Sequence, residues 1–322
     1  MWQYIVRRIF ISFLVLIGIS MILYILIRSM PGDYVMTVTS GKRNITPAMI
    51  AHLRHVYGLD TSIPQGYFRW IIKAFQGDFG NSFTYLRPVI DVIGEKMIVS
   101  FTLAFPALIL EMLIGIPLGI FSATKPYSKR DNLFTVIAFL GISFPSFFLG
   151  LILKRVLAYG WKLFPPFGLV DATKNYTGFA LILDKAHHLI LPIFCLAFID
   201  MAYYMRYTRS NMLEVLGSDY IRTARAKGLP ERKVIYRHGF RNTLIPIVTL
   251  VGASIPTLFM GAIITENLFA IPGIGYAGYM ALQQGDIPFI MAFNLVLAAL
   301  TLLGNLLADI SYALVDPRVR LS

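Results

Sequence analysis

Six apolar runs, separated by polar and charged stretches, constrain the fold of this chain more than any other feature of its sequence. In chain order, the runs cover residues 9–27, 98–123, 133–153, 189–205, 244–264 and 287–308. A helix rises about 1.5 Å per residue and the hydrocarbon core of a bilayer is about 30 Å thick, so runs of this length predict transmembrane helices. Because backbone groups in lipid must find their partners within the segment, we expect an all-α, polytopic membrane protein with six transmembrane helices.

The composition agrees with a membrane protein and excludes an ordinary soluble domain. Of the 322 residues, 57% are hydrophobic and only 14% are charged, whereas soluble domains carry about 25% charged residues. The formal net charge of +12 is explained in so apolar a chain by cytoplasmic loops that face anionic lipid, and we expect no nucleic-acid partner. The single cysteine, Cys195, lies inside an apolar run and predicts neither an intrachain disulfide nor a metal site.

The positions of the basic residues predict which side of the membrane each loop faces. Arg7 and Arg8 precede the first run, three cations lie in the short loop 125–131, and the loop after the fourth run is densely basic. Short, cation-rich loops face the cytoplasm. With six crossings, both termini then lie in the cytoplasm, and Arg318 and Arg320 near the C-terminus agree with this orientation.

The stretch 30–96, between the first and second runs, predicts a small helical external domain. Amphipathic patterns cover 47–57, where Thr46 can cap the helix, and 66–75, which carries three aromatic residues. The cations of this stretch do not contradict an external position, because loops longer than about 60 residues cross the membrane largely regardless of charge.

These features divide the chain into three parts. A first transmembrane helix occupies 1–29, and the external helical domain occupies 30–96. The remaining 97–322 forms a five-helix transmembrane core with a cytoplasmic segment at 210–243.

A short helix with a stop signal is predicted within the basic loop 218–246, which reads SDYIRTARAKGLPERKVIYRHGFRNTLIP. Ser218 can cap this helix, and its first turn holds Asp219. Gly228 suits the position just after the helix, and Pro230 suits the first turn of the next one. Because isolated helices need about 12–15 residues to be stable, so short a helix predicts a partner that packs on it.

This loop resembles the cytoplasmic coupling segment of bacterial ABC importer permeases of the peptide-type (oligopeptide, dipeptide and nickel) family, in its first-permease form. Arg222-Thr223-Ala224 stands where the superfamily has EAA, and Gly228 is the glycine that follows. The ending RHGFRNTLIP, which closes on Pro246, is similar to the peptide branch rather than to the sugar or amino-acid branches. Other short motifs resemble the same family in the same order: Pro31-Gly32-Asp33, Tyr57-Gly58-Leu59-Asp60, Gly77-Asp78-Phe79-Gly80, Arg87-Pro88-Val89 and the closing Ala313-Leu314-Val315-Asp316-Pro317-Arg318.

The resemblance implies a transmembrane permease subunit that forms half of the translocation path for oligo- or dipeptides in a bacterial inner (plasma) membrane. A second homologous permease subunit, two ATP-binding subunits and an extracytoplasmic substrate-binding protein would complete the importer. ATP hydrolysis would then take place on the partner subunits, and this chain would not be an enzyme. A nickel chelate or an oligosaccharide as the substrate of a permease of the same family stays open as an alternative.

The resemblance also implies two groups of site residues. Those that would couple the chain to an ATPase subunit are Tyr220, Arg222, Ala224, Arg225 and Gly228. Those in the external loop before the last transmembrane helix, close to the binding protein and to the mouth of the path, are Glu266, Phe269, Pro272, Gly273 and Gly275.

No motif in the sequence predicts a cofactor, a metal or a catalytic residue. The P-loop pattern G-x-x-x-x-G-K-[ST] and the zinc pattern H-E-x-x-H are absent, and no nucleophile stands in a pattern with a base. The glycines of 273–278 fit G-x-G-x-x-G, but Pro272 precedes them and no strand–helix–strand unit surrounds them. We interpret these glycines as a tight turn in an external loop.

Two carboxyl residues within the apolar runs, Glu111 and Asp200, keep a secondary transporter open as an alternative. We favour a structural interpretation of both residues. Glu111 would be protonated or paired and would face the helix bundle, and Asp200 would pair with an arginine one or two turns further on. Gly115 and Gly119 predict close packing of the second helix against a neighbour. An intramembrane enzyme would need paired catalytic groups, which the sequence does not show.

Overall fold

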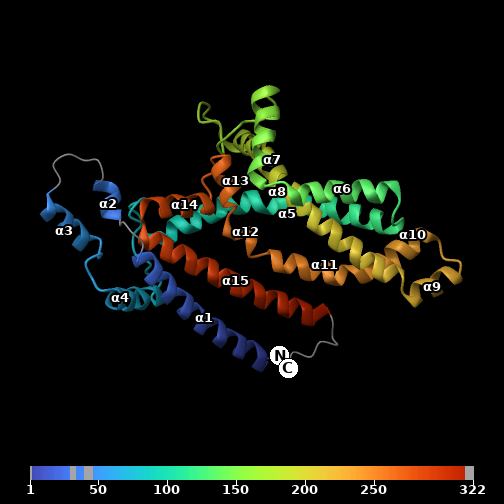
Figure 1. The fold of residues 1–322 in the computed structure, drawn as a ribbon, viewed down its shortest axis with the longest axis horizontal. Helices are drawn as coiled ribbons and strands as arrows, with labels where there is room; N and C mark the ends of the chain where they lie inside the picture. The colour runs from blue at the N-terminus through green and yellow to red at the C-terminus, as the bar shows by residue number, and fades with distance from the viewer. Residues whose placement is uncertain (1, 30–33, 40–45, 316–322) are drawn as a thin grey trace.

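The computed structural model describes residues 2–29, 34–39 and 46–315, and this part of the chain is almost entirely helical (Figure 1). Within it, the only β-type pairing is an isolated bridge between Asn81 and Pro88. The α-helices are α1 (Trp2–Ser29), α2 (Tyr34–Thr39), α3 (Pro47–Val56), α4 (Ile63–Phe75), α5 (Val89–Thr124), α6 (Lys129–Ser143), α7 (Ser146–Leu153), α8 (Gly178–Leu216), α9 (Asp219–Ala226), α10 (Glu231–Lys233), α11 (Arg241–Ser254), α12 (Thr257–Met260), α13 (Ile263–Leu268), α14 (Ile274–Gln284) and α15 (Ile287–Val315). Two π-helical segments, η1 (Lys154–Gly160) and η2 (Val234–Phe240), continue α7 and α10.

Five helical stretches of the described chain are long and apolar enough to cross a membrane. They are Val6–Met36, of which residues 30–33 lie outside the described part of the chain, Val89–Thr124, Gly178–Leu216, Pro246–Leu268 and Ile287–Leu306. The third predicted run corresponds to a pair of helices, Lys129–Ser143 and Ser146–Gly160, which meet at 102° and count as a sixth span when taken together. The predicted all-α, polytopic membrane fold is therefore confirmed.

The third run is a broken helix rather than the straight one that its hydropathy predicts. α6 ends at Ser143, Phe144 adopts an extended conformation, and Pro145 leads into α7. A residue before proline is disfavoured in the α conformation because the proline ring meets its backbone, so the chain turns at this point. Beyond the break, the ammonium group of Lys154 in η1 donates a hydrogen bond to the carbonyl of Leu268 at the end of α13 (2.7 Å).

α5 and α8 form the centre of the bundle, and small residues let their backbones meet. A Cβ on Gly115 would lie 2.7 Å from the carbonyl oxygen of Met201, and a Cβ on Gly119 would lie 2.6 Å from that of Met205. Real Cβ atoms do not approach backbone oxygens so closely, so both positions require glycine. This confirms the close packing that the glycine spacing predicts.

Three helices lie between α1 and α5 within the described residues, and both predicted amphipathic patterns fold as helices. The hydroxyl of Thr46 caps α3 by accepting a backbone N–H, as predicted (3.3 Å). α4 begins somewhat before its predicted pattern, at Ile63, and packs on α1. There the hydroxyl of Tyr67 lies 3.0 Å from that of Ser20, and both groups are buried.

Asp286 fastens the chain before α5 to the C-terminal helices. Its buried carboxylate accepts hydrogen bonds from the hydroxyl of Ser82 (2.5 Å) and the backbone N–H of Thr84 (3.0 Å). It also accepts the N–H of Phe289 in the first turn of α15 (3.2 Å). Because α5 begins at Val89, this attachment lies directly before the long central helix.

Several short helices lie at two opposite ends of the bundle, while α7, α12 and α13 lie between these ends (Figure 1). α2, α3, α4 and α14 lie at the left-hand end in this view, and α9 and α10 lie at the right-hand end. α1 and α15 run beside one another along one flank. The motif Pro31-Gly32-Asp33 and the C-terminal residues Arg318 and Arg320 lie outside the described residues.

Candidate functional site

The short helix α9, at one end of the bundle, ends as the sequence predicts. Lys227 is its C-cap, and Gly228 follows with a φ of 72°, which favours glycine. Ser218 occupies the predicted N-cap position with an extended backbone, but its hydroxyl donates to the carbonyl of Val215 (2.6 Å) rather than capping α9. The predicted side-chain cap by Ser218 is therefore wrong. The extended backbone of Ser218 and the positive φ of Gly228 mark the two ends of the helix.

α9 has one face buried against its own chain and one face exposed. Ile221 and Ala224 are buried and pack with Val234 of η2, and Leu216 and Leu229 complete this apolar cluster. The structure therefore places the predicted coupling residue Ala224 on the inward face. Its small side chain lets α9 lie close to η2.

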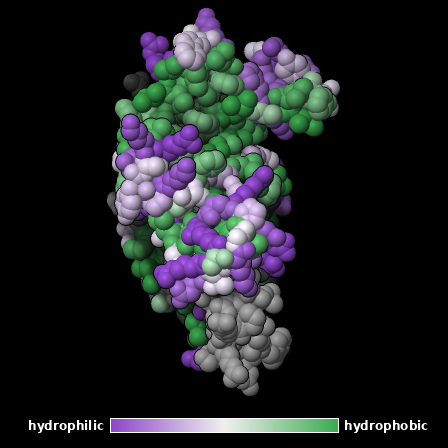
Figure 2. Space-filling view, turned by 90° about the vertical axis from the view of Figure 1, so that its right-hand side faces the viewer, coloured by the Kyte–Doolittle hydropathy of each residue, from purple (hydrophilic) through white to green (hydrophobic). Residues whose placement is uncertain are grey.

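The other predicted coupling side chains lie on the outer face of α9. Tyr220, Arg222 and Arg225 are exposed. Figure 2 looks at this end of the molecule and shows hydrophilic residues gathered around its middle, with hydrophobic residues above them. The guanidinium of Arg225 makes two hydrogen bonds to Glu231 (2.8 and 3.2 Å) and holds the pKa of that carboxyl below its usual value.

The apolar cluster joins α9 to the long helices. Leu216 of the cluster is the last residue of α8, and Val234 begins η2, which continues into α11. The hydroxyl of Tyr220 accepts a hydrogen bond from the side-chain amide of Asn242 in α11 (3.1 Å). A displacement of α9 therefore reaches both α8 and α11 directly.

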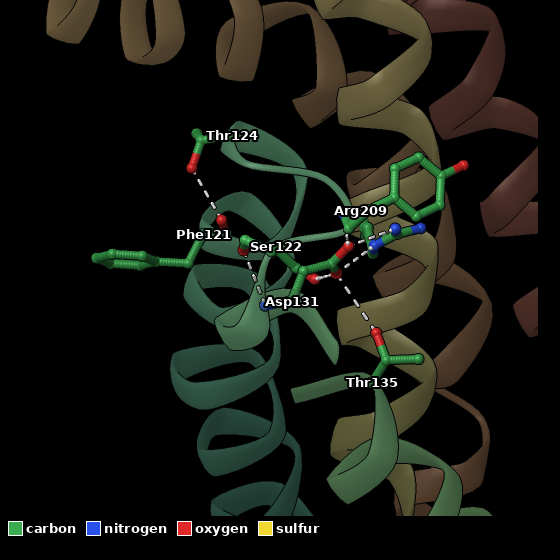
Figure 3. A network of polar contacts seen from close by, with 8 residues as sticks. Phe121, Ser122, Thr124, Asp131, Thr135 and Arg209 are labelled. Atoms are coloured by element: carbon green, nitrogen blue, oxygen red, sulfur yellow. Dashed lines mark hydrogen bonds and ion pairs between the residues drawn. The ribbon is translucent and has the colours of Figure 1, made fainter. Parts of the chain in front are cut away.

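A buried ion pair behind this end of the bundle was missed by sequence reasoning (Figure 3). Asp131, in the first turn of α6, accepts two hydrogen bonds from the guanidinium of Arg209 in α8, each 2.8 Å long. The hydroxyl of Ser122 in α5 and the backbone N–H of Tyr127 also donate to this carboxylate. One carboxylate thus links α5, α6 and α8. The partners are far apart in the sequence, and no spacing pattern connects them.

The second predicted site is the chain from α13 into α14, and Glu266 lies at its centre. The carboxylate of Glu266 is completely buried and accepts hydrogen bonds from the hydroxyl of Ser100 (2.6 Å) and from the backbone N–H groups of Ala262 (3.0 Å) and Tyr276 (2.8 Å). It therefore ties this loop to α5 and holds the loop's two ends together.

The remaining residues of the predicted external site also build the loop rather than its outer surface. Phe269 is buried, and Pro272 is half-buried. A Cβ on Gly273 would lie 2.6 Å from the Glu266 carboxylate, and a Cβ on Gly275 would lie 2.9 Å from the backbone nitrogen of Ile263. Close packing therefore requires glycine at both positions. The predicted tight turn is wrong, because Gly273 is the N-cap of α14 and Gly275 and Gly278 lie within that helix.

Glu111 and Asp200 line one cavity of about 360 Å³ between α5, α8 and the α11–α12 segment. The predicted pairing of Asp200 with an arginine on its own helix is wrong. Arg206 lies over the ring of Phe139 (5.3 Å), and Arg209 is held by Asp131. No group of three metal-ligating side chains occurs in the described part of the chain.

The sequence matches known transport proteins over nearly its whole length. Residues 115–321 match the family model described as "Binding-protein-dependent transport system inner membrane component", and residues 1–104 match the model of the N-terminal part of such membrane components. The chain is 40% identical over 320 residues to the oligopeptide transport system permease protein AppB of Bacillus subtilis (strain 168), covering 99% of each chain.

Two further relatives are dipeptide transport system permease proteins. The chain is 37% identical over 337 residues to DppB of Escherichia coli (strain K12), with 99% of each chain covered. It is 38% identical over 322 residues to DppB of Lactococcus lactis subsp. cremoris (strain MG1363), with 100% of each chain covered. Similarity of this extent shows that the chain belongs to the family of binding-protein-dependent transport system inner membrane components, and that it is a multi-pass membrane protein of a transport system.

Proposed function

We propose that this chain is the transmembrane permease subunit of a bacterial ABC importer for oligo- or dipeptides and forms half of its translocation path. The names of its relatives support the peptide substrate. The observation that carries the coupling role is α9, which has a polar outer face and an apolar inner face joined to α8 and α11. When a partner that binds the outer face displaces such a helix, the contacts of the inner face transmit this displacement to the membrane-spanning helices.

The same proposal orients the molecule. The end that carries α9 and α10 faces the cytoplasm, in agreement with the basic residues gathered there, and both termini face the same side. The opposite end, with α2–α4 and the α13–α14 loop, faces outwards in the bacterial inner membrane. An extracytoplasmic substrate-binding protein would dock at this outer end, close to the loop that Glu266 holds together.

The proposed importer needs partners for each of these ends. A second homologous permease subunit would complete the path, and two ATP-binding subunits would hydrolyse ATP, one of them against α9. Tyr220, Arg222 and Arg225 supply the exposed contacts with that subunit. Ala224 and Gly228 do not supply contacts with that subunit. Ala224 packs α9 against η2, and Gly228 ends the helix.

The experiment that tests the coupling role reverses one charge on the outer face of α9. In the reconstituted complex, Arg222→Glu is expected to lower ATPase activity stimulated by the liganded binding protein about tenfold, since lost charge-assisted hydrogen bonds weaken docking. Arg222 is exposed, so the bundle itself stays folded. Uptake of labelled alanine peptides of two to five residues is measured in the same vesicles and falls in parallel.

A matched control carries the same charge reversal outside α9 and away from the end at which the binding protein would dock. Arg130→Glu changes an exposed arginine in the first turn of α6 and should leave stimulation within about twofold of wild type, an effect below about 0.5 kcal/mol. Equal loss in both variants, or normal stimulation in Arg222→Glu, would contradict the coupling role. Uptake that continues without ATP would favour a secondary transporter, and uptake of a nickel chelate or an oligosaccharide in place of the peptides would change the substrate class.

A further inference from the structure

The cavity between α5, α8 and the α11–α12 segment lies within the membrane-spanning part of the bundle. Glu111 stands midway along the apolar run 98–123, and it faces the same cavity as Asp200 of α8. The volume of about 360 Å³ falls within the range of about 300–1,000 Å³ found for small-molecule sites. The space is therefore large enough for part of a small organic solute.

Glu111 is a buried carboxyl residue that has no partner among the described residues. Its residue is only 6% exposed, and within the described part of the chain its carboxylate has neither a hydrogen bond nor an ion pair. Asp200 is more exposed and likewise has no ion pair among the described residues. The lining contains no lysine, arginine or histidine. The cavity therefore presents two carboxyl groups and no balancing cation of its own.

The carboxylate of Glu111 is costly to bury without a partner, and the negative charge of Asp200 in the same cavity destabilises it further. A single cation that enters the cavity relieves both effects. The other polar groups of the lining suit an ammonium group: the hydroxyls of Tyr204 and Ser254 lie 3.2 Å apart, and the ring of Tyr203 offers a π-face. A bare metal ion is a poorer match, because no cluster of three ligating side chains occurs in the described chain.

We propose that Glu111 and Asp200 form an anionic station on the translocation path that receives the N-terminal ammonium group of a peptide in transit. This inference rests on the proposed function, because it requires that peptides pass between these helices. An ammonium group is the feature that unmodified linear peptides share whatever their side chains. A station that recognises it therefore accepts many sequences. Its contacts are few, so the peptide can leave again.

The test uses the complete importer reconstituted with its binding protein and ATP-binding subunits. Labelled alanine peptides of two to five residues are the probes, and the peptide that wild type imports best is used throughout. Asp200→Asn and the double variant Glu111→Gln/Asp200→Asn keep side-chain volume while removing charge. We expect peptide uptake to fall about tenfold in the double variant, the loss typical of a charge-assisted hydrogen bond. Stimulation of ATPase activity by the liganded binding protein should stay near wild type.

Glu214→Gln is the matched control, because Glu214 is an exposed carboxylate on α8 outside the cavity. Its uptake should equal that of wild type. A second readout does not depend on activity. A water-soluble carbodiimide activates a carboxyl group, the amine of the peptide displaces the urea, and an amide forms. Mass spectrometry should find the peptide on Glu111 or Asp200, but not with an N-acetylated peptide and not in the double variant.

Each outcome decides the proposal. Wild-type uptake in the double variant, or no adduct on either residue, overturns the station while leaving the importer function intact. Loss of the second permease subunit on co-purification of Asp200→Asn also overturns it, because the carboxylates would then serve a cation of that subunit. If the wild-type complex imports none of the peptides, the proposed function fails, and the station falls with it.

Discussion

Asp131 is an almost fully buried carboxylate whose two oxygens both face the guanidinium of Arg209. A buried ion pair contributes little net stability, but removing one partner leaves an uncompensated charge and is strongly destabilising. The sequence shows Asp131 only as the single anion of a basic loop and Arg209 as one of many cations. Their pairing comes from the packing of α6 on α8, which no local pattern encodes.

Asp131→Asn should lower the apparent melting temperature of the purified protein clearly. The amide cannot neutralise Arg209, so the free energy of unfolding should fall. Loss of one partner of a buried ion pair costs about 3–5 kcal/mol, and we expect the lower end of this range because the guanidinium is partly exposed. Differential scanning fluorimetry in detergent measures the shift. Asp219→Asn is the control, because Asp219 forms an ion pair with Arg222 at 3.3 Å and both side chains are exposed. Removing this exposed ion pair should lower the free energy of unfolding by less than about 1 kcal/mol. Equal shifts in both variants would show that the buried pair has no special role.

At the scale of elements, the hydropathy of the sequence predicts where the helices occur, but it does not predict which helices pack together or where one of them breaks. The glycine spacing correctly indicates that α5 packs closely on a neighbour, but it does not identify α8 as that neighbour. The break at Pro145 is missed because proline also occurs inside continuous spans, as Pro106 does in α5. The burial of Ala224 follows from the seat of α9 on η2, a tertiary contact that no local pattern reveals.

Gly119→Ala should destabilise the α5–α8 pair, because the new Cβ would lie 2.6 Å from the carbonyl oxygen of Met205. Overpacking of this kind costs about 1–3 kcal/mol. Gly94→Ala is a control in the same helix, since no atom lies within 4 Å of its added Cβ. That change should be neutral or stabilise α5 by up to about 1 kcal/mol. Thermal unfolding of both variants measures the difference. An unchanged melting temperature for Gly119→Ala would show that α5 and α8 can move apart to accommodate the methyl group without loss of stability.

At the scale of the whole molecule, the candidate sites lie at opposite ends and in the middle of one bundle. The sequence predicts the sites at the two ends, because basic loops and glycine-rich segments are visible as local patterns. It does not reveal the cavity, because Glu111 and Asp200 come together only through the packing of α5 on α8. The proposed orientation of the bundle in the membrane rests on the distribution of charge and can be measured directly.

Single cysteines at Gly217 and Thr173 test this orientation in a Cys195→Ala background, where the buried native thiol is removed. Both positions are exposed, Gly217 next to α9 and Thr173 in the loop between η1 and α8. On intact cells, a membrane-impermeant thiol reagent should label Thr173→Cys, and it should label Gly217→Cys only after the membrane is opened. Labelling of Gly217→Cys from outside would reverse the proposed topology.

α8 is one continuous helix of 39 residues from Gly178 to Leu216, and its second half has the properties of a stiff lever. Its one internal proline, Pro192, lies before Asp200, so no proline interrupts the stretch from Asp200 to Leu216. About 24 Å of uninterrupted helix therefore separates the cavity from the seat of α9. In a rigid helix, a small rotation at Leu216 turns Asp200 by the same angle. The position of α9 and the orientation of Asp200 in the cavity therefore change together.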